Sequence, residues 1–260
     1  MRARRLAVLL LLLALPFAAA ACGGSKKSST TTTTAAAATP TDAVKAAAEK
    51  TANAGSLKLT LNVAGAAAAT KIAVAGGGGF DTTNREGQLH LRFAVSGVSG
   101  TMDVVLQGTD LYLRSPLLSL ALPSGKTWIK VDLSKQAKAG GLDLSKILAQ
   151  DPTQALDALQ NASSVVQVGQ AQSGGVTLTH YRATITKSAA TGIGGGTYDV
   201  WVGDDGYIHR VRTVVAGTGS TAAAVRATSN LSGFGEPVTV TVPPASQTAT
   251  SNGSIPGLGG

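Results

Sequence analysis

The stretch SLKLTLNV at residues 56–63 alternates apolar and polar side chains with a period of two. Successive side chains of a β-strand point to opposite faces of a sheet, so this spacing predicts a strand with one apolar face. The alternation returns in several later stretches, and turn-forming residues such as Gly108-Thr109-Asp110 separate them. The pattern predicts a large β-sheet whose apolar side chains share one face.

The apolar residues in phase with this alternation are the candidates for that face. They are Leu57, Leu59, Leu61, Leu89, Leu91, Phe93, Met102, Val104, Leu106, Leu111, Leu113, Ile129 and Val131. Later strands are predicted over residues 164–170, 176–187, 196–202, 207–216, 222–231 and 238–242, with Asp204-Asp205-Gly206 as a tight hairpin turn. The total is ten or eleven strands in a predominantly antiparallel sheet.

Helical patterns are few and short. One covers residues 42–54, with Thr41 or Asp42 as the N-cap, Gly55 as the stop and an apolar face that is nearly all alanine. A second covers residues 151–160, where Pro152 suits the first helical position, and residues 144–148 are the candidate for a third. The predicted fold class is therefore α+β, a large antiparallel sheet with two or three short helices.

Such a sheet must cover its apolar face, and the predicted helices are few and rich in small residues. In one solution the sheet curls around the helices as a half-barrel and leaves an apolar cavity in which an acyl chain could lie, and the thirteen in-phase apolar residues are the candidates for its lining. In the other, the strands divide into two sheets that cover each other as a sandwich without a cavity. Hydrophobic patterning alone does not choose between these two arrangements.

The N-terminal residues have the layout of an export signal. Arg2, Arg4 and Arg5 precede an apolar run over residues 6–17, and small residues lead directly to Cys22. The run is shorter than the roughly 20 residues that span a bilayer. We therefore expect residues 1–21 to be a lipoprotein signal peptide and Cys22 to carry the lipid. An ordinary cleaved signal is the alternative, but it leaves a lone reactive thiol in an oxidising compartment.

Low-complexity segments flank the central part of the chain. Residues 22–41 contain the expected lipidated Cys22 and a Gly, Ser, Thr and Ala tract, which predicts a flexible tether. Residues 246–260 are similarly polar and glycine-rich and predict a disordered tail. The sequence thus predicts one domain over residues 42–245, held by a lipid at the outer leaflet of the bacterial plasma membrane, on its extracytoplasmic face.

The formal charge of the chain is +8 at pH 7, and aromatic residues make up 4%. The basic residues are scattered singly, without the stacking platforms and cationic stripe of a nucleic-acid-binding protein. The charge therefore favours attraction to anionic lipid headgroups or wall polymers, and it argues against nucleic acid as a partner.

Signatures of catalysis are missing from the sequence. His90, His180 and His209 lie far apart, with no second ligand at the spacing of a metal site. Asp204 and Asp205 suit a turn better than an acid–base pair. Neither a G-x-S-x-G nor an H-E-x-x-H motif occurs. We expect no enzymatic activity, no cofactor and no metal.

Two arginines are candidates for contact with a lipid headgroup. Arg210 and Arg212 are one strand period apart and therefore share a face, where they could meet a phosphate or a sugar. The alternative is that both are solvated cations on an exposed sheet face.

Five segments carry a resemblance to a known family: residues 111–114 (LYLR), 125–133 (GKTWIKVDL), 179–182 (THYR), 200–212 (VWVGDDGYIHRVR) and 234–244 (FGEPVTVTVPP). In their order, and together with the expected lipid anchor and tether, they resemble the actinobacterial and mycobacterial LppX/LprAFG lipoproteins. The resemblance covers most of residues 42–245. It implies a LolA-like architecture, in which a curved antiparallel sheet wraps over helices and encloses a hydrophobic cavity for acylated lipids or glycolipids.

The resemblance favours the half-barrel over the sandwich. It implies an envelope lipoprotein that carries an acylated lipid or glycolipid between membrane and envelope, with a membrane transporter as a candidate partner. The alternative is a structural or interaction lipoprotein whose sheet packs on itself and has no ligand cavity. This chain departs from the family pattern in extra alanine and glycine at residues 64–69 and 76–79, so the resemblance determines neither the cavity size nor the ligand.

Overall fold

The computed structural model describes residues 39–67, 70–136, 156, 159–185, 196–216 and 224–251. These residues belong to a compact unit that begins at Ala38. The predicted signal peptide, the lipidated Cys22 and the tether as far as residue 38 lie outside the described residues. The predicted helix at 144–148 and most of that at 151–160 also lie outside them, although Leu156, Leu159 and Gln160 are helical.

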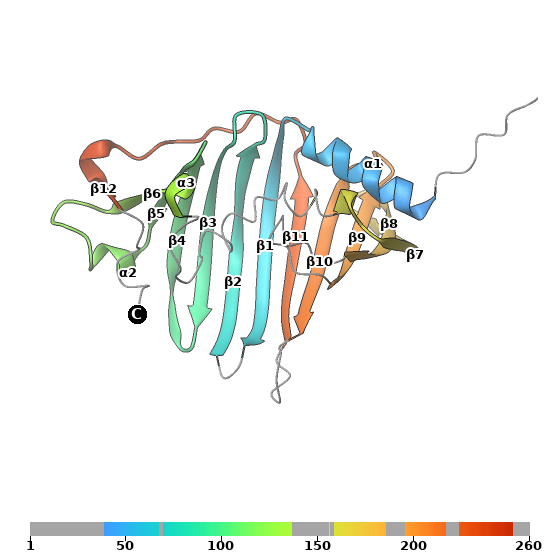
Figure 1. The fold of residues 1–260 in the computed structure, drawn as a ribbon, viewed down its shortest axis with the longest axis horizontal. Coiled ribbons are helices and arrows are strands. Elements are labelled where there is room, and N and C mark those ends of the chain that lie inside the picture. Colours follow the sequence, from blue (N-terminus) through green and yellow to red (C-terminus); the bar gives the residue numbers. More distant parts are fainter. Residues whose placement is uncertain are drawn as a thin grey trace, which may run out of the picture. The chain divides into compact units, whose positions relative to one another are not determined.

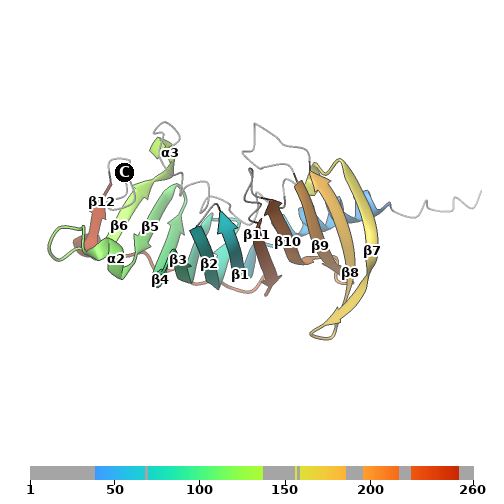
Figure 2. The same ribbon diagram turned by 90° about the horizontal axis from the view of Figure 1, so that it is seen from below.

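Twelve strands form a single sheet in the described part of the chain (Figure 1). They are β1 (Ser56–Ala67), β2 (Thr70–Asp81), β3 (Glu86–Val95), β4 (Val98–Gln107), β5 (Asp110–Arg114), β6 (Trp128–Asp132), β7 (Ser164–Ser173), β8 (Val176–Ile185), β9 (Gly196–Gly203), β10 (Ile208–Ala216), β11 (Ala224–Ser232) and β12 (Thr248–Thr250). Their order is β12-β6-β5-β4-β3-β2-β1-β11-β10-β9-β8-β7. Figure 2 shows the strands side by side, with the sheet seen from below.

The sheet is mixed but predominantly antiparallel, as the sequence predicts. Eleven strands pair antiparallel with their neighbours, while β12 pairs parallel to β6 through Thr248, Ala249 and Thr250. Because all described strands belong to this one sheet, they do not form the two-sheet sandwich that the hydrophobic pattern had left open.

The C-terminal region differs from the sequence-based expectation in two ways. Residues 238–242 were predicted as a strand, but they have no strand pairing and run as an extended segment. Residues 246–251 were assigned to a disordered tail, but Ala245–Gln247 form a short 3-10 helix (η1) and β12 follows it. Pairing with β6 gives this polar segment the backbone hydrogen bonds that its composition does not reveal. Residues 252–260 lie outside the described part.

Helix α1 (Pro40–Ala52) begins two residues before its predicted start. Thr39, and not Thr41 or Asp42, is the N-cap. Its side-chain oxygen accepts a hydrogen bond from the Asp42 backbone N–H, and the Asp42 carboxylate accepts one from the Thr39 backbone N–H. Pro40 then occupies the first helical position, where its missing N–H is harmless. Two single-turn helices, α2 (Pro116–Ser119) and α3 (Leu133–Gln136), flank β6 in the chain.

Strand β2 was not predicted, because four consecutive glycines interrupt its apolar pattern at residues 76–79. In the structure these glycines lie in the middle of the strand, paired to β1 and β3 on either side. A Cβ atom at Gly76 or Gly78 would overlap the backbone carbonyl oxygens of His90 or Gln88 in β3. The glycines therefore permit a close approach of β2 to its neighbour that other residues would prevent.

The buried side chains form two clusters on one face of the sheet. The first lies between helix α1 and strands β1, β11, β10, β9, β8 and β7. Val44, Ala48, Leu57 and Ile208 are fully buried in it. The second lies over β3 to β6 and includes Leu113, Ile129 and Val131. Leu89 is partly buried and packs against both clusters. We call this side of the sheet the apolar face and the opposite side the outer face.

A smaller cluster lies on the outer face and fixes the C-terminal segment. Val105, Tyr112 and Trp128 are buried there against Val240 and Val242. Further contacts are hydrogen bonds from Lys126 Nζ to the carbonyl oxygens of Ala245 and Ser246 and an ion pair between Lys58 and Glu236. Residues 236–247 thus run along the outer face as a strap before β12 closes the edge of the sheet (Figure 1).

Candidate functional site

The apolar face brings together the large apolar side chains of the central strands in the part of the chain that the structure describes. Strand register places all thirteen sequence-predicted candidates on it, because residues directly opposite each other in paired strands share a face. One row across seven strands consists of Leu231, Leu59, Gly78, Leu89, Val104, Leu113 and Ile129. The sequence-based prediction of one shared face is therefore confirmed for these residues.

Helix α1 covers one end of the apolar face, where it packs against β7, β9 and β10. Val44, Ala47 and Ala48 supply its buried side, and their small size brings the helix close to the sheet. The helix is also fixed by a buried polar contact. The Thr51 hydroxyl donates to the Ala47 carbonyl at 2.7 Å and accepts from the Ile208 backbone N–H at 2.9 Å. We call the cluster beneath α1 the closed end of the apolar face.

The C-terminal end of α1 is held by a second group of contacts at the β9–β10 turn. Lys50 Nζ donates to the Asp205 carbonyl at 2.6 Å and lies 4.4 Å from the centre of the Tyr207 ring. Tyr207 in turn stacks on Phe234 with 4.3 Å between ring centres. Asp205 also pairs with His209 at 3.0 Å, so this predicted turn has a structural role.

The central strands carry a band of apolar side chains that is only partly buried. Leu61 in β1, Phe93 in β3 and Met102 in β4 are intermediate in exposure, whereas Leu57, Leu91 and Leu113 are buried. Sequence reasoning missed Ile72 and Val74 of β2, which lie in the same band opposite Gly65 and Val63 of β1. Ile72 and Val74 do alternate with smaller or polar residues, but the four glycines that follow make the segment too short to be recognised as a strand. We call this band, residues 61, 63, 72, 74, 93 and 102, the open band.

Two glycines of β2 interrupt the rows of apolar side chains next to the open band. Gly76 lies between Leu61 and Leu91 in the register, and Gly78 lies between Leu59 and Leu89. With strands about 4.8 Å apart, the flanking leucines stand on two strands that are roughly 10 Å apart. The backbone of β3 occupies the space that a Cβ atom of Gly76 or Gly78 would take, so these positions add no side chain to the row between the flanking leucines.

The outer face carries a network of charged and aromatic side chains at β8 to β10. Asp199 accepts from Arg212 Nη2 at 2.9 Å and from Arg182 Nε at 3.1 Å, and its carboxylate also pairs with His180 at 3.0 Å. Partial burial raises the pKa of Asp199, but the hydrogen bonds from Arg212, His180 and Arg182 outweigh it and hold the pKa below its ordinary value. Trp201 stacks on His180 with 4.3 Å between ring centres.

Both headgroup candidates belong to this outer-face network. Arg212 pairs with Asp199, and Arg210 Nε donates to Asn230 Oδ1 at 2.7 Å. Each guanidinium also lies within 6 Å of the Trp201 ring centre. Val211 between them is buried on the apolar face, so the two arginines point to the opposite side. A headgroup of a lipid lying on the apolar face would not meet them there.

The other candidates for chemistry also have structural partners. His90 and Arg114 both pair with Asp103, at 2.6 and 2.7 Å. Within the described ranges, no three His, Cys, Asp or Glu side chains are grouped as they would be to hold a metal ion. Among the same residues, no helix is long and apolar enough to cross a membrane.

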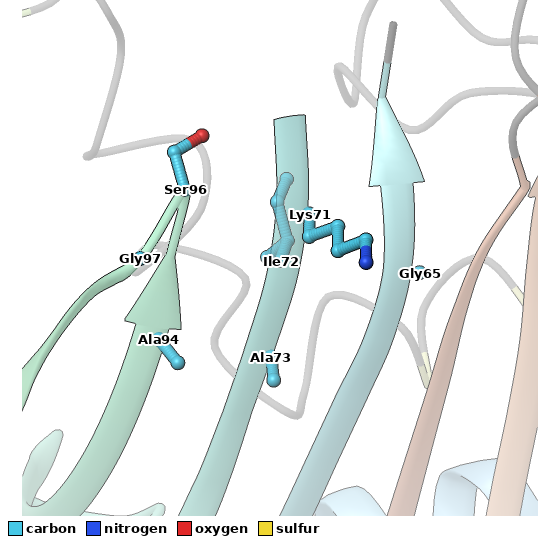
Figure 3. A pocket seen from close by; sticks show the side chains of 7 residues that line it. All are labelled: Gly65, Lys71, Ile72, Ala73, Ala94, Ser96 and Gly97. Atoms are coloured by element: carbon cyan, nitrogen blue, oxygen red, sulfur yellow. The ribbon is translucent and has the colours of Figure 1, made fainter. Parts of the chain in front are cut away.

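A shallow pocket of about 380 Å³ lies at the ends of β1, β2 and β3 (Figure 3). Its lining includes Lys71, Ala73, Ala94 and Ser96. Ala73 is adjacent to Val74 of the open band, and Ala94 to Phe93, so these two alanines belong to the outer face. Gly65 and Ile72 of the apolar face also line the pocket, so it lies at the strand ends and is formed by residues of both faces.

Comparisons with known proteins identify the fold. A search with protein-family models finds no match to the sequence, and a comparison with curated proteins also finds none. Among solved structures, the lipoprotein LppX of Mycobacterium tuberculosis matches with a TM-score of 0.50 and 12% identity, over 78% of this chain and 98% of that one. LprF of Mycobacterium bovis matches with a TM-score of 0.45 and 13% identity, over 78% and 96%. The match to LppX shows that the chain has an LppX-like fold.

Proposed function

We propose that this protein is a cell-envelope lipoprotein that binds an acylated lipid or glycolipid on its apolar face and carries it between membrane and envelope. The open band is the observation that supports this function most strongly. Sheet faces with so many large apolar side chains are normally covered, and Leu61, Phe93 and Met102 remain partly exposed. If these strands form a half-barrel, with α1 covering its closed end, the apolar face would line the cavity that the sequence resemblance implies.

Lipid binding of this kind requires no chemical step. Each methylene removed from water contributes roughly 0.8 kcal/mol, so one long acyl chain on the open band suffices for tight binding. Apolar contacts do not distinguish headgroups, so selectivity would depend on polar groups at the rim of the face. Neither catalysis nor a cofactor is part of the proposed function.

The anchor belongs to the same proposal. Lipidation of Cys22 after removal of residues 1–21 would hold the domain at the outer leaflet of the plasma membrane, on its extracytoplasmic side. A tethered domain meets its lipid at a high local concentration, which lowers the affinity that transfer requires. A membrane transporter as the partner in transfer is compatible with this location.

The test is to look for lipid in the purified protein. The chain from residue 22 onward, with Cys22→Ser to remove the anchor, is extracted with organic solvent, and the extract is examined by mass spectrometry. We expect an acylated lipid at about one molecule per chain, and Met102→Trp should remove it by filling the open band. Thr101→Trp is the matched control, because Thr101 is the neighbour on the outer face of the same strand.

The alternative of a structural or interaction lipoprotein predicts a different outcome. If no lipid is found, if a fluorescent fatty-acyl probe does not bind, and if Met102→Trp and Thr101→Trp behave alike, the lipid-binding proposal is wrong.

A further inference from the structure

The end of the sheet that carries the β1–β2 and β3–β4 hairpin tips lies opposite the end that α1 and the C-terminal strap follow (Figure 1). The acidic residues of the strands around β1 and β2 lie at only one of these two ends. Strands β1, β10 and β11 contain no Asp or Glu, and the acids of β2 and β3 are Asp81 and Glu86, which pair opposite each other at the strap end. We call the opposite end, with its hairpin turns, the tip end.

Three exposed cations lie on the outer face near the tip end: Lys71, Arg92 and Arg226. Among the residues that the structure describes, none of the three has an acidic partner within ion-pair distance. The residues between them are small. Arg226 is opposite Ala64, Ala64 is opposite Ala73, and Arg92 is opposite Ala75. The cations therefore stand around a low, uncharged floor, in contrast to Arg182 and Arg212, which Asp199 neutralises.

Large apolar side chains are exposed at the same end. Val95 and Val98 lie opposite each other at the tip of the β3–β4 hairpin, with 36% and 52% of their surface exposed. They belong to the apolar face, where they continue the line of Phe93 and the open band. Exposed valines at a hairpin tip, beside unpaired cations, are suited to contact a surface that has an apolar interior beneath anionic groups.

The shallow pocket lies between these two features. Lys71 and Ser96 are among its lining residues, and Figure 3 shows the Lys71 side chain extending from β2 towards β1. The pocket is a shallow surface depression of about 380 Å³. A single phosphate-bearing headgroup could lie there, with its charge opposite the lysine ammonium group.

We propose that the tip end is a docking surface for an anionic lipid bilayer, with Lys71, Arg92 and Arg226 contacting headgroups and Val95 and Val98 entering the interface. Charge complementarity favours an anionic bilayer as the partner, because a cationic patch without acids is attracted to anionic lipid headgroups. The valines add an apolar contact that a bilayer can accept and a soluble polyanion cannot. Docking in this way would place the open band next to the membrane, so that an acyl chain could move onto it without crossing water.

Vesicle binding tests this surface separately from lipid carriage. The chain from residue 22 with Cys22→Ser is floated with phosphatidylcholine vesicles that contain or lack phosphatidylglycerol. We expect binding only to the anionic vesicles, and a fall with added salt. Replacing Lys71, Arg92 and Arg226 by Gln should weaken binding about fivefold for each cation, or on the order of 100-fold together.

A control with the same change in charge makes the result specific. Lys45, Lys58 and Arg85 are also exposed and lie in α1 or near the strap end, so replacing them by Gln should change binding little. Equal losses in the two triple variants, or equal binding to neutral vesicles, would overturn the proposal. Val95→Ser with Val98→Ser should weaken vesicle binding several-fold but leave binding to soluble polyphosphate unchanged. If the double variant binds vesicles normally and the chain binds polyphosphate equally well, the surface recognises an anionic polymer and the bilayer proposal is wrong.

Discussion

The closed end and the open band lie on the same face of the same sheet, but they differ in what covers them. At the closed end, α1 buries Val44 and Ala48 against Leu57 and Ile208, and a polar contact fixes the helix in place. In the open band, Leu61, Phe93 and Met102 present equally apolar side chains that remain partly exposed. The comparison suggests a division of roles, in which the closed end stabilises the fold and the open band is available to a ligand.

The largest expected difference between the two regions is in stability. Leu57→Ala removes a fully buried side chain, so it should lower the free energy of unfolding by about 2–5 kcal/mol. Leu61→Ala, two strand periods along on the same face, should cost less than about 1.5 kcal/mol because the side chain is already partly exposed. Urea denaturation of the two variants measures the difference. Equal losses would mean that the open band is as much a part of the core as the closed end.

A smaller effect is expected at the contact that fixes α1. Thr51→Val keeps the shape of the side chain but leaves the buried Ile208 N–H without an acceptor, which should cost about 1–3 kcal/mol. Thr51→Ser retains the hydroxyl group and is the control. Hydrogen exchange should show faster exchange of the Ile208 amide in Thr51→Val. Unchanged exchange at that amide would show that the hydroxyl does not hold the helix to the sheet.

The outer face should contribute a pH dependence that neither apolar region has. Because the pKa of Asp199 is lower in the folded protein than in the unfolded chain, its contribution is complete above the unfolded pKa of about 4 and is lost as the pH falls through the folded pKa. Asp199→Asn should therefore destabilise the protein at pH 7, and the difference from the wild type should shrink below about pH 4. A difference that is constant across this range would contradict the ion-pair network.

Sequence reasoning located the apolar face because alternation is a local property of each strand. Leu57, Leu59 and Leu61 show it directly, and pairing only had to bring such strands together in phase. It failed where the decisive partner is distant in the sequence. The role of Gly76–Gly79 depends on the close approach of β3, and the order of residues 246–251 depends on pairing with β6.

The same limit applies to the site. That Arg210 and Arg212 share a face follows from their spacing, but that this is the outer face depends on Val211 being buried beneath α1. The tip-end surface combines residues from β2, β3 and β11, and their spacing within the chain does not reveal that they are neighbours. Unpaired exposed cations can be recognised only once the acids of the neighbouring strands have been placed.

Photocrosslinking tests most directly whether the open band is where the lipid lies. The chain from residue 22 with Cys22→Ser is incubated with a fatty-acyl probe that carries a diazirine near the end of its chain, and the labelled peptides are mapped by mass spectrometry. We predict that labelling falls on the open band, at Leu61, Phe93 and Met102, and that it is competed by unlabelled lipid. Labelling confined to outer-face residues such as Thr101 or Trp201, or labelling that unlabelled lipid does not reduce, would contradict binding on the apolar face.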